Sequence, residues 1–274
     1  MRCEIFRHRS LRKSDYGNDF KDSELMIKQI DNINQADRNY LVKSYYGRKF
    51  LAYLQAYGTD YDFCRFFRLE YDNCTGYMFQ INATLVVCAD HEFPAGELEQ
   101  FILMNLPYRV EAPSYVLKNI ENIEGYHKLK RTQFEFSEHM PEHFNEAELE
   151  ENPKLDEAYA IITEGFPNMK NYGLWITENS HRIRRGISRI YLYKKCTTAT
   201  VIYDVDDHVL IGQVATRESA RGNGYARELL YWLGHKLRLQ GKKISLFALD
   251  YRESFYHEIG FKEISVECVI ERKL

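Results

Sequence analysis

The chain has 274 residues, which is enough for one large domain or two ordinary ones. Its 37 Lys and Arg residues and 40 Asp and Glu residues give a net charge of −3, so the overall charge does not point to nucleic acid or to an anionic membrane. No apolar run approaches the roughly 20 residues of a membrane-spanning helix, and the first residues carry no apolar signal core. We therefore expect a cytoplasmic globular protein without nucleic-acid or membrane partners.

Cysteine and histidine spacing gives no sign of a metal site. The cysteines lack Cys-x-x-Cys spacing, and without an export signal we expect reduced thiols. His139 and His143 are four residues apart, but Pro141 lies between them and no third ligand is evident, so we expect no metal there. The cysteines are Cys3, Cys64, Cys74, Cys88, Cys196 and Cys268.

The first half of the chain alternates between helical and strand patterns. Apolar periodicity and turn residues predict a helix near Ser23–Ile33, a helix within Tyr40–Tyr57, strands at Cys64–Tyr71 and Tyr77–Ala89 joined by a turn at 72–76, a helix from Pro94 to Leu106, and strands at Tyr108–Val116 and Lys128–Phe136. The acidic segment Ser137–Lys154 has no apolar period and is the best candidate linker. We therefore predict two units, residues 1–150 and 151–274.

The second half shows clearer patterns. We predict one helix through Tyr159, Ile162 and Phe166, a second through Leu174, Ile176 and Ile183, strands at Ile187–Lys194 and Thr197–Tyr203, a central strand at His208–Thr216, a helix ending at Arg238, a buried strand at Lys243–Asp250, a further helix, and a last strand at Phe261–Glu271. The continuously apolar Val209–Ile211 indicates a strand buried on both faces.

A glycine turn connects the central strand to the long helix. Gly222 and Gly224 permit positive φ and have no Cβ to keep a ligand away from the backbone. The first turn of a helix offers backbone N–H groups without partners, at the positive end of the helix dipole. The amides of about residues 222–227 are therefore candidates to bind a phosphate or pyrophosphate. A tight turn with a helix cap is the alternative interpretation.

Two motifs in this half resemble those of a known family. Arg221-x-x-Gly224-x-Ala226, after the strand ending Val214-Ala215-Thr216, is similar to the coenzyme A signature of the GNAT N-acetyltransferases. The later Tyr256-x-x-x-Gly260-Phe261 resembles the end of that family's following helix. The resemblance covers about residues 155–274 and implies an α/β fold with a central mixed, mostly antiparallel sheet flanked by helices. The first half resembles a degenerate copy only faintly.

The resemblance implies direct transfer of an acetyl or acyl group from acetyl-CoA to a primary amine, without an acyl-enzyme intermediate or a metal. Tyr256 would protonate the departing thiolate, which suits a phenol that is protonated at neutral pH. A core tyrosine is the alternative. The residues that the resemblance places at the cofactor are Val214, Ala215, Thr216, Arg221, Gly222, Asn223, Gly224, Tyr225, Ala226, Asp250 and Phe255.

The resemblance does not identify the general base or the acceptor. The central strand offers Gln213 and His208 but no carboxylate, and Asp250 could relay a proton or cap its helix. Arg182 belongs to a basic cluster that either complements a helix dipole or steers an anionic substrate; its other members are His181, Arg184 and Arg185. The acceptor is a small-molecule or peptide amine, and a homodimer is left open.

Two further expectations concern function. The alternative to an enzyme is a non-catalytic acyl-CoA-binding or protein-interaction protein on the same scaffold. In the first half, Asp90, Glu92 and Glu97 place carboxylates where a pyrophosphate would sit, and Pro94 removes an N–H donor. We therefore expect one coenzyme A site per chain, in the second half.

Overall fold

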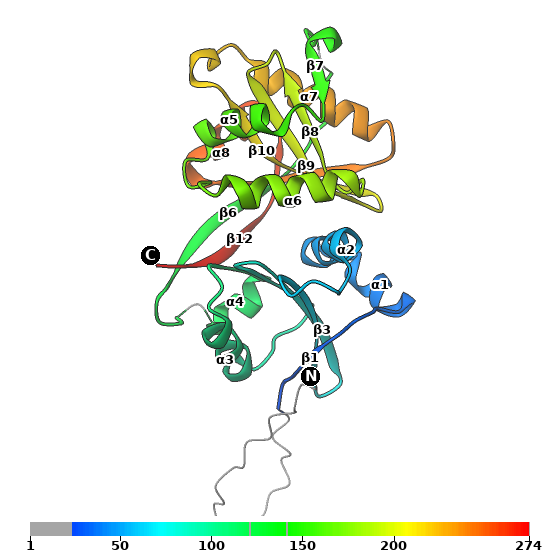
Figure 1. Ribbon diagram of the computed structural model, residues 1–274, viewed down its shortest axis with the longest axis vertical. Helices are drawn as coiled ribbons and strands as arrows, with labels where there is room; N and C mark the ends of the chain where they lie inside the picture. The colour runs from blue at the N-terminus through cyan, green and yellow to red at the C-terminus, as the bar shows by residue number, and fades with distance from the viewer. Residues whose placement is uncertain (1–23, 121, 141, 274) are drawn as a thin grey trace, which may run out of the picture.

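The computed structural model describes residues 24–120, 122–140 and 142–273, and over this part the strands form one continuous sheet (Figure 1). The strands run in the order β1-β2-β3-β4-β5-β12-β6-β11-β10-β9-β8-β7. Only β4/β5 and β10/β11 pair in parallel. Their bounds are β1 Met26–Gln29, β2 Cys64–Tyr71, β3 Cys74–Ile81, β4 Thr84–Cys88, β5 Arg109–Glu111, β6 Tyr126–Glu135, β7 Leu149–Glu151, β8 Arg189–Tyr193, β9 Thr197–Val205, β10 His208–Thr216, β11 Lys243–Leu249 and β12 Lys262–Arg272.

Helices cover both faces of this sheet. On one face, α2 packs against strands of both halves, and α5 and α6 pack on the second half. On the other face, α3 and α4 cover the first half and α7 and α8 the second. The helices are α1 Gln35–Leu41, α2 Tyr45–Tyr57, α3 Ala95–Asn105, α4 Ser114–Ile120, α5 Leu155–Gly165, α6 Tyr172–Arg184, α7 Tyr225–Arg238 and α8 Asp250–Glu258, with short 3₁₀ turns η1 Glu146–Glu148 and η2 Glu218–Ala220.

The two halves exchange their last strands. β12, at the end of the chain, pairs with β5 of the first half, while β6 of the first half pairs with β11 of the second. β6 and β12 then pair with each other over most of their length, so both run between the two lobes (Figure 1). Each half therefore completes the sheet of the other.

A buried ionic cluster lies beside this exchange. Lys49 of α2 contacts the carboxylate of Glu111 on β5 at 2.8 Å, and Arg131 of β6 contacts it at 3.3 Å. Burial alone would raise the pKa of Glu111, but these cations and Arg109 outweigh it and hold the pKa well below its usual value. Arg131 also lies 4.2 Å from the ring of Phe247 on β11, so the cluster links both halves.

The predicted fold class is confirmed, and four local predictions are corrected. The segment expected as a helix near Ser23–Ile33 contains β1, which pairs with the edge of β2, although Ser23 lies outside the described residues. The run 77–89 is two strands, because Asn82 turns the chain at φ 48°. The strand expected at 108–116 ends at Glu111, since Pro113 starts α4. Within the acidic 137–154 segment, β7 pairs with β8.

The exchange predicts that neither half folds alone. A fragment of residues 151–274 lacks β6 and leaves the edge of β11 without a partner; a fragment of residues 1–150 lacks β12. We expect each fragment to give no cooperative unfolding transition by circular dichroism and the two co-expressed fragments to elute together and unfold cooperatively. Independent cooperative unfolding of fragment 151–274 would contradict this.

Candidate functional site

The site begins where two central strands part. β10 and β11 pair in parallel from His208↔Lys243 to Ile211↔Leu246, and both strands then continue without pairing with each other. The pairing of β10 with β9 shifts between Gly212 and Ala215, and Gln213 adopts φ 50° within this bulge. A bulge adds local twist and bends the strand. The end of β10 therefore diverges from β11 and leaves an open gap.

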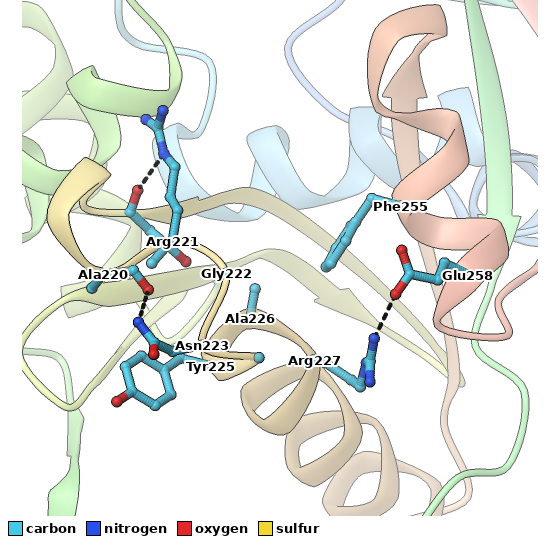
Figure 2. A pocket seen from close by; sticks show the side chains of 11 residues that line it. Ala220, Arg221, Gly222, Asn223, Tyr225, Ala226, Arg227, Phe255 and Glu258 are labelled. Atoms are coloured by element: carbon cyan, nitrogen blue, oxygen red, sulfur yellow. Dashed lines mark hydrogen bonds and ion pairs between the residues drawn. The ribbon is translucent and has the colours of Figure 1, made fainter.

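The glycine turn forms the outer part of the site. Gly222 and Gly224 have φ of 82° and 80°, and Gly224 is the N-cap of α7 without a side-chain hydrogen bond to the helix. A Cβ at either glycine would meet no protein atom within 4 Å. The turn borders a cavity of about 580 Å³ that also reaches α8 (Figure 2). Its lining is Thr216, Ala220, Arg221, Gly222, Asn223, Gly224, Tyr225, Ala226, Arg227, Phe255 and Glu258.

Side chains around this turn bind other parts of the second half. The guanidinium of Arg221 donates to the carbonyls of Thr216 at 3.2 Å and Glu164 at 3.0 Å, which ties the turn to the C-terminus of α5. Asn223 Nδ2 donates to the Ala220 carbonyl at 3.0 Å (Figure 2). Arg227 of α7 pairs with Glu258 of α8 at 2.7 Å across the cavity. Arg221 thus fixes the backbone of the turn.

Two smaller cavities continue from the turn towards the gap. The first, of about 420 Å³, shares Thr216, Arg221, Ala226 and Phe255 with the large cavity. The second, of about 90 Å³, shares Val214, Tyr251, Arg252 and Tyr256 with the first. The three cavities therefore follow one another from the N-terminus of α7, along the end of β10, to the gap between β10 and β11.

Tyr256 is buried beside both smaller cavities. Its side chain is 5% exposed and packs against Phe134, Phe255 and Phe261 at centroid distances of 5.1–5.7 Å. Burial raises the pKa of Tyr256 to about 12, against the opposing charge of Arg252. Among the described residues, none hydrogen-bonds its hydroxyl. Tyr256 thus belongs to an aromatic cluster and also lines the cavities. Its surroundings are compatible both with a core tyrosine and with a proton donor at the cavity.

The structure brings most of the predicted site residues together. Val214, Ala215 and Thr216 line the middle cavity, and the turn residues from Arg221 to Ala226 line the outer one, together with Phe255. Asp250 does not line these cavities: its side chain is 67% exposed and lies 3.9 Å from Lys130. It therefore takes no part in the function proposed below.

Other residues at the site lay outside the sequence prediction. The C-terminal end of α5 supplies Glu164, Gly165 and the cap residue Phe166, and α8 supplies Tyr251 and Arg252. Helical spacing could have found Arg252, because it precedes Tyr256 by one turn and shares its face. No local pattern marked the end of α5 as part of the site, because it reaches the site through the packing of α5 against β10.

Of the polar side chains on β10, His208 could accept a proton, whereas the neutral amide of Gln213 cannot act as a base. His208, at the start of β10, contacts Asp207 at 2.6 Å, and burial together with the charge of Arg48 lowers its pKa. Gln213 accepts a hydrogen bond from Thr200 at 3.1 Å. The smallest cavity has no carboxylate and no histidine in its lining.

Two members of the basic cluster, His181 and Arg182, pack against the first half, whereas Arg184 and Arg185 are exposed. His181 Nε2 is 2.7 Å from the Ala56 carbonyl and its ring stacks on Tyr57. Arg182 is 4% exposed and donates to Asn179 at 3.0 Å. Neither of these two residues lines the three cavities.

The first half closes the corresponding gap. At the end of β4, the hydroxyl of Tyr115 on α4 donates to the Ala89 carbonyl. Phe93 is buried against Gly76, where an added Cβ would lie 2.7 Å from its ring. Asp90 accepts a hydrogen bond from Tyr40 at 3.0 Å just before α3. Tyr251 is the second residue of α8, as Tyr115 is of α4, but it is 71% exposed and borders a cavity.

The described residues contain neither a candidate metal site nor a helix that could span a membrane. No group of three or more His, Cys, Asp or Glu side chains there could hold a metal ion. His139 stacks on Tyr231, and His143 is exposed beside Glu142. Over the same residues, each helix is too short or too polar to cross a bilayer.

Neither a family model nor a curated protein matches the chain. Solved structures do. A Drosophila protein matches with a TM-score of 0.59 and 10% identity over 90% of this chain and 98% of its own. A tandem GNAT protein from the clavulanic acid biosynthesis pathway, solved without acetyl-CoA, matches with a TM-score of 0.57 and 9% identity over 91% of this chain and 98% of its own. A GCN5-related N-acetyltransferase from Sphaerobacter thermophilus matches with a TM-score of 0.55 and 15% identity over 91% of this chain and 95% of its own. The chain therefore has the fold of the GNAT acetyltransferases, with two GNAT-like halves in tandem.

Proposed function

We propose that the second half transfers an acetyl group from acetyl-CoA to a primary amine on a small molecule or peptide. The observation that carries this proposal is the row of three cavities from the α7 N-terminus to the gap between β10 and β11. Such a row suits a long ligand with an anionic middle and a reactive end.

The outer cavity fits a pyrophosphate. The turn presents two glycines at positive φ and a helix N-terminus without a side-chain cap, so backbone N–H groups of 222–227 are available to an anion. Because a Cβ at Gly222 or Gly224 would occupy only open space, the absent side chains leave room for a ligand.

The middle cavity fits a pantetheine arm. Beyond Ile211, β10 no longer pairs with β11, so the backbone groups of Val214 and Thr216 on that edge are free of sheet bonds to β11. An extended amide-containing arm can add to such an edge as a strand would. Ala226 and Phe255 supply apolar walls on the helix side.

The reactive end would lie beside Tyr256. In the transfer, the amine nitrogen attacks the thioester carbonyl, the carbon–sulfur bond breaks, and the Tyr256 hydroxyl gives its proton to the leaving thiolate. The amine proton leaves to solvent or to a base, and the tyrosinate is reprotonated. Since the pKa of Tyr256 is raised to about 12, the phenol remains protonated, and able to donate, throughout the neutral range.

A non-catalytic acyl-CoA-binding protein is the second candidate. The smallest cavity has no carboxylate or histidine to accept the amine proton, and this favours binding without transfer. Thiol release from acetyl-CoA with a panel of amines separates the two. Release above the hydrolysis rate supports the enzyme; coenzyme A binding without any release supports the binding protein.

The first prediction concerns the turn. Gly224→Val places a branched side chain at φ 80°, next to the proposed pyrophosphate, and should weaken coenzyme A binding about 10-fold or more by calorimetry. Gly241→Val is the matched control, because Gly241 has φ 76° and equal free space outside the cavities. Equal coenzyme A affinity in both variants would show that the turn is only structural.

The second prediction concerns the acid. Tyr256→Phe should lower kcat about 10²-fold and leave the KM for acetyl-CoA similar, because it removes only a proton donor. Tyr231→Phe is the control: it also loses a hydroxyl, one that donates to the Ile259 carbonyl away from the cavities. A near-normal kcat in Tyr256→Phe would assign the residue to the aromatic core.

The third prediction concerns the number of sites. The Tyr115–Ala89 hydrogen bond, the buried Phe93 and the carboxylate of Asp90 close the first half to an anionic ligand. Calorimetric titration with coenzyme A should give one site per chain. A stoichiometry of two would refute this.

A further inference from the structure

Arg252 is a cation without a carboxylate partner inside the proposed substrate cavities. It borders both the 420 Å³ and the 90 Å³ cavity, at the junction between them. Within the described residues, its only hydrogen bond is to the carbonyl of Gly165, and it forms no ion pair. A guanidinium has five N–H donors, so most of its donors are left to solvent or to a ligand.

Nearby acids are engaged elsewhere. Glu164 accepts from Arg217 at 3.0 Å and from the backbone N–H of Glu218 at 2.7 Å. Glu253, next to Arg252 on α8, binds Thr132 and faces Lys130. No side chain of either cavity except Glu164 is acidic. Among the described residues, Arg252 therefore has no carboxylate partner in the cavities.

The orientation of Arg252 is fixed by its neighbours. Its guanidinium carbon is 4.1 Å from the ring centroid of Phe166 and 5.3 Å from that of Tyr251. Aromatic rings contact the flat faces of a guanidinium, so its N–H donors, which lie in its plane, remain available. Two of these donors can bind the two oxygens of one carboxylate. The bond to Gly165 anchors one end of the group.

A coenzyme A phosphate is a poor match for this cation. Arg252 does not line the 580 Å³ cavity, where the turn offers its amides to the pyrophosphate. The anionic group would instead enter from the reactive end, where Tyr256 lies one helical turn away. A smaller anion carried by the acceptor or by the acyl group fits that position.

We propose that Arg252 binds a carboxylate carried by a substrate, so that the protein prefers an amine acceptor with a carboxylate, such as an amino acid, or an acyl group with one, such as malonyl. This rests on the proposed function. The charge-assisted pair should favour the carboxylated substrate about 10- to 100-fold over its neutral counterpart.

The test compares matched substrates by kcat/KM. One arm uses acetyl-CoA with lysine or with lysinamide; the other uses cadaverine with malonyl-CoA or with acetyl-CoA. The wild type should prefer the carboxylated member of one pair. That pair shows whether the carboxylate belongs to the acceptor or to the acyl group. Arg252→Gln should remove that preference through KM, and Arg252→Lys should keep part of it. Arg238→Gln, with the same charge change at the far end of α7, should keep it fully.

Calorimetry separates this inference from the proposed function. Titration of lysine, lysinamide and malonate into the protein, with and without coenzyme A, reports carboxylate binding even if no acetyl transfer occurs. Equal affinity of wild type and Arg252→Gln for every ligand, or discrimination that persists in Arg252→Gln, overturns the role of Arg252. Unchanged coenzyme A binding in the same titrations shows that the variant is folded and that the proposed cofactor site stands.

Discussion

The parallel pairing of β10 and β11 lasts for four residue pairs, and the candidate site depends on its ending there. Backbone groups that leave a buried sheet must find other partners, water or a ligand. β11 keeps β6 as its partner on the opposite edge, whereas the bulge at Gly212–Ala215 turns the end of β10 away, so the facing edges of β10 and β11 are left to water or a ligand. This constraint positions the glycine turn, the end of α5 and the start of α8 around one series of cavities.

The C-terminus of α5 keeps those elements in place. Two consecutive carbonyls there, of Glu164 and Gly165, accept hydrogen bonds from Arg221 and Arg252, which come from opposite sides of the cavities. Cations are favoured at this end of a helix by the dipole. The same contacts leave the amides of the turn free, since Arg221 is turned towards the protein. The side chain of Arg221 thus positions the turn, and the backbone amides of the turn stay available for a ligand.

Sequence patterns predicted the second half well because its signals are local. The apolar run of β10, the two glycines and the leucine period of α7 each specify their own element. Two failures lay at local signals, because Asn82 and Pro113 mark the ends of strands that were expected to continue. Others involve long-range partners. β1 has only four residues and forms a strand by pairing with the edge of β2; Asp250 follows β11 as expected, yet packing leaves it beside Lys130. Spacing within α8 places Arg252 on the face of Tyr256, but its contacts with Gly165 and Phe166 at the end of α5 depend on the tertiary packing.

The exchange of β6 and β12 gives the two halves unequal freedom to diverge. A substitution around Phe93 alters only the closed gap of the first half, but a substitution in β6 alters the strand that supports β11 and thus the floor of the other half's cavities. The first half can therefore lose a ligand site of its own, while its last strand, β6, remains constrained by its pairing with β11 beside the cavities of the second half. In genetic terms, the two halves are inherited as one unit: a crossover between them would separate each sheet from its final strand.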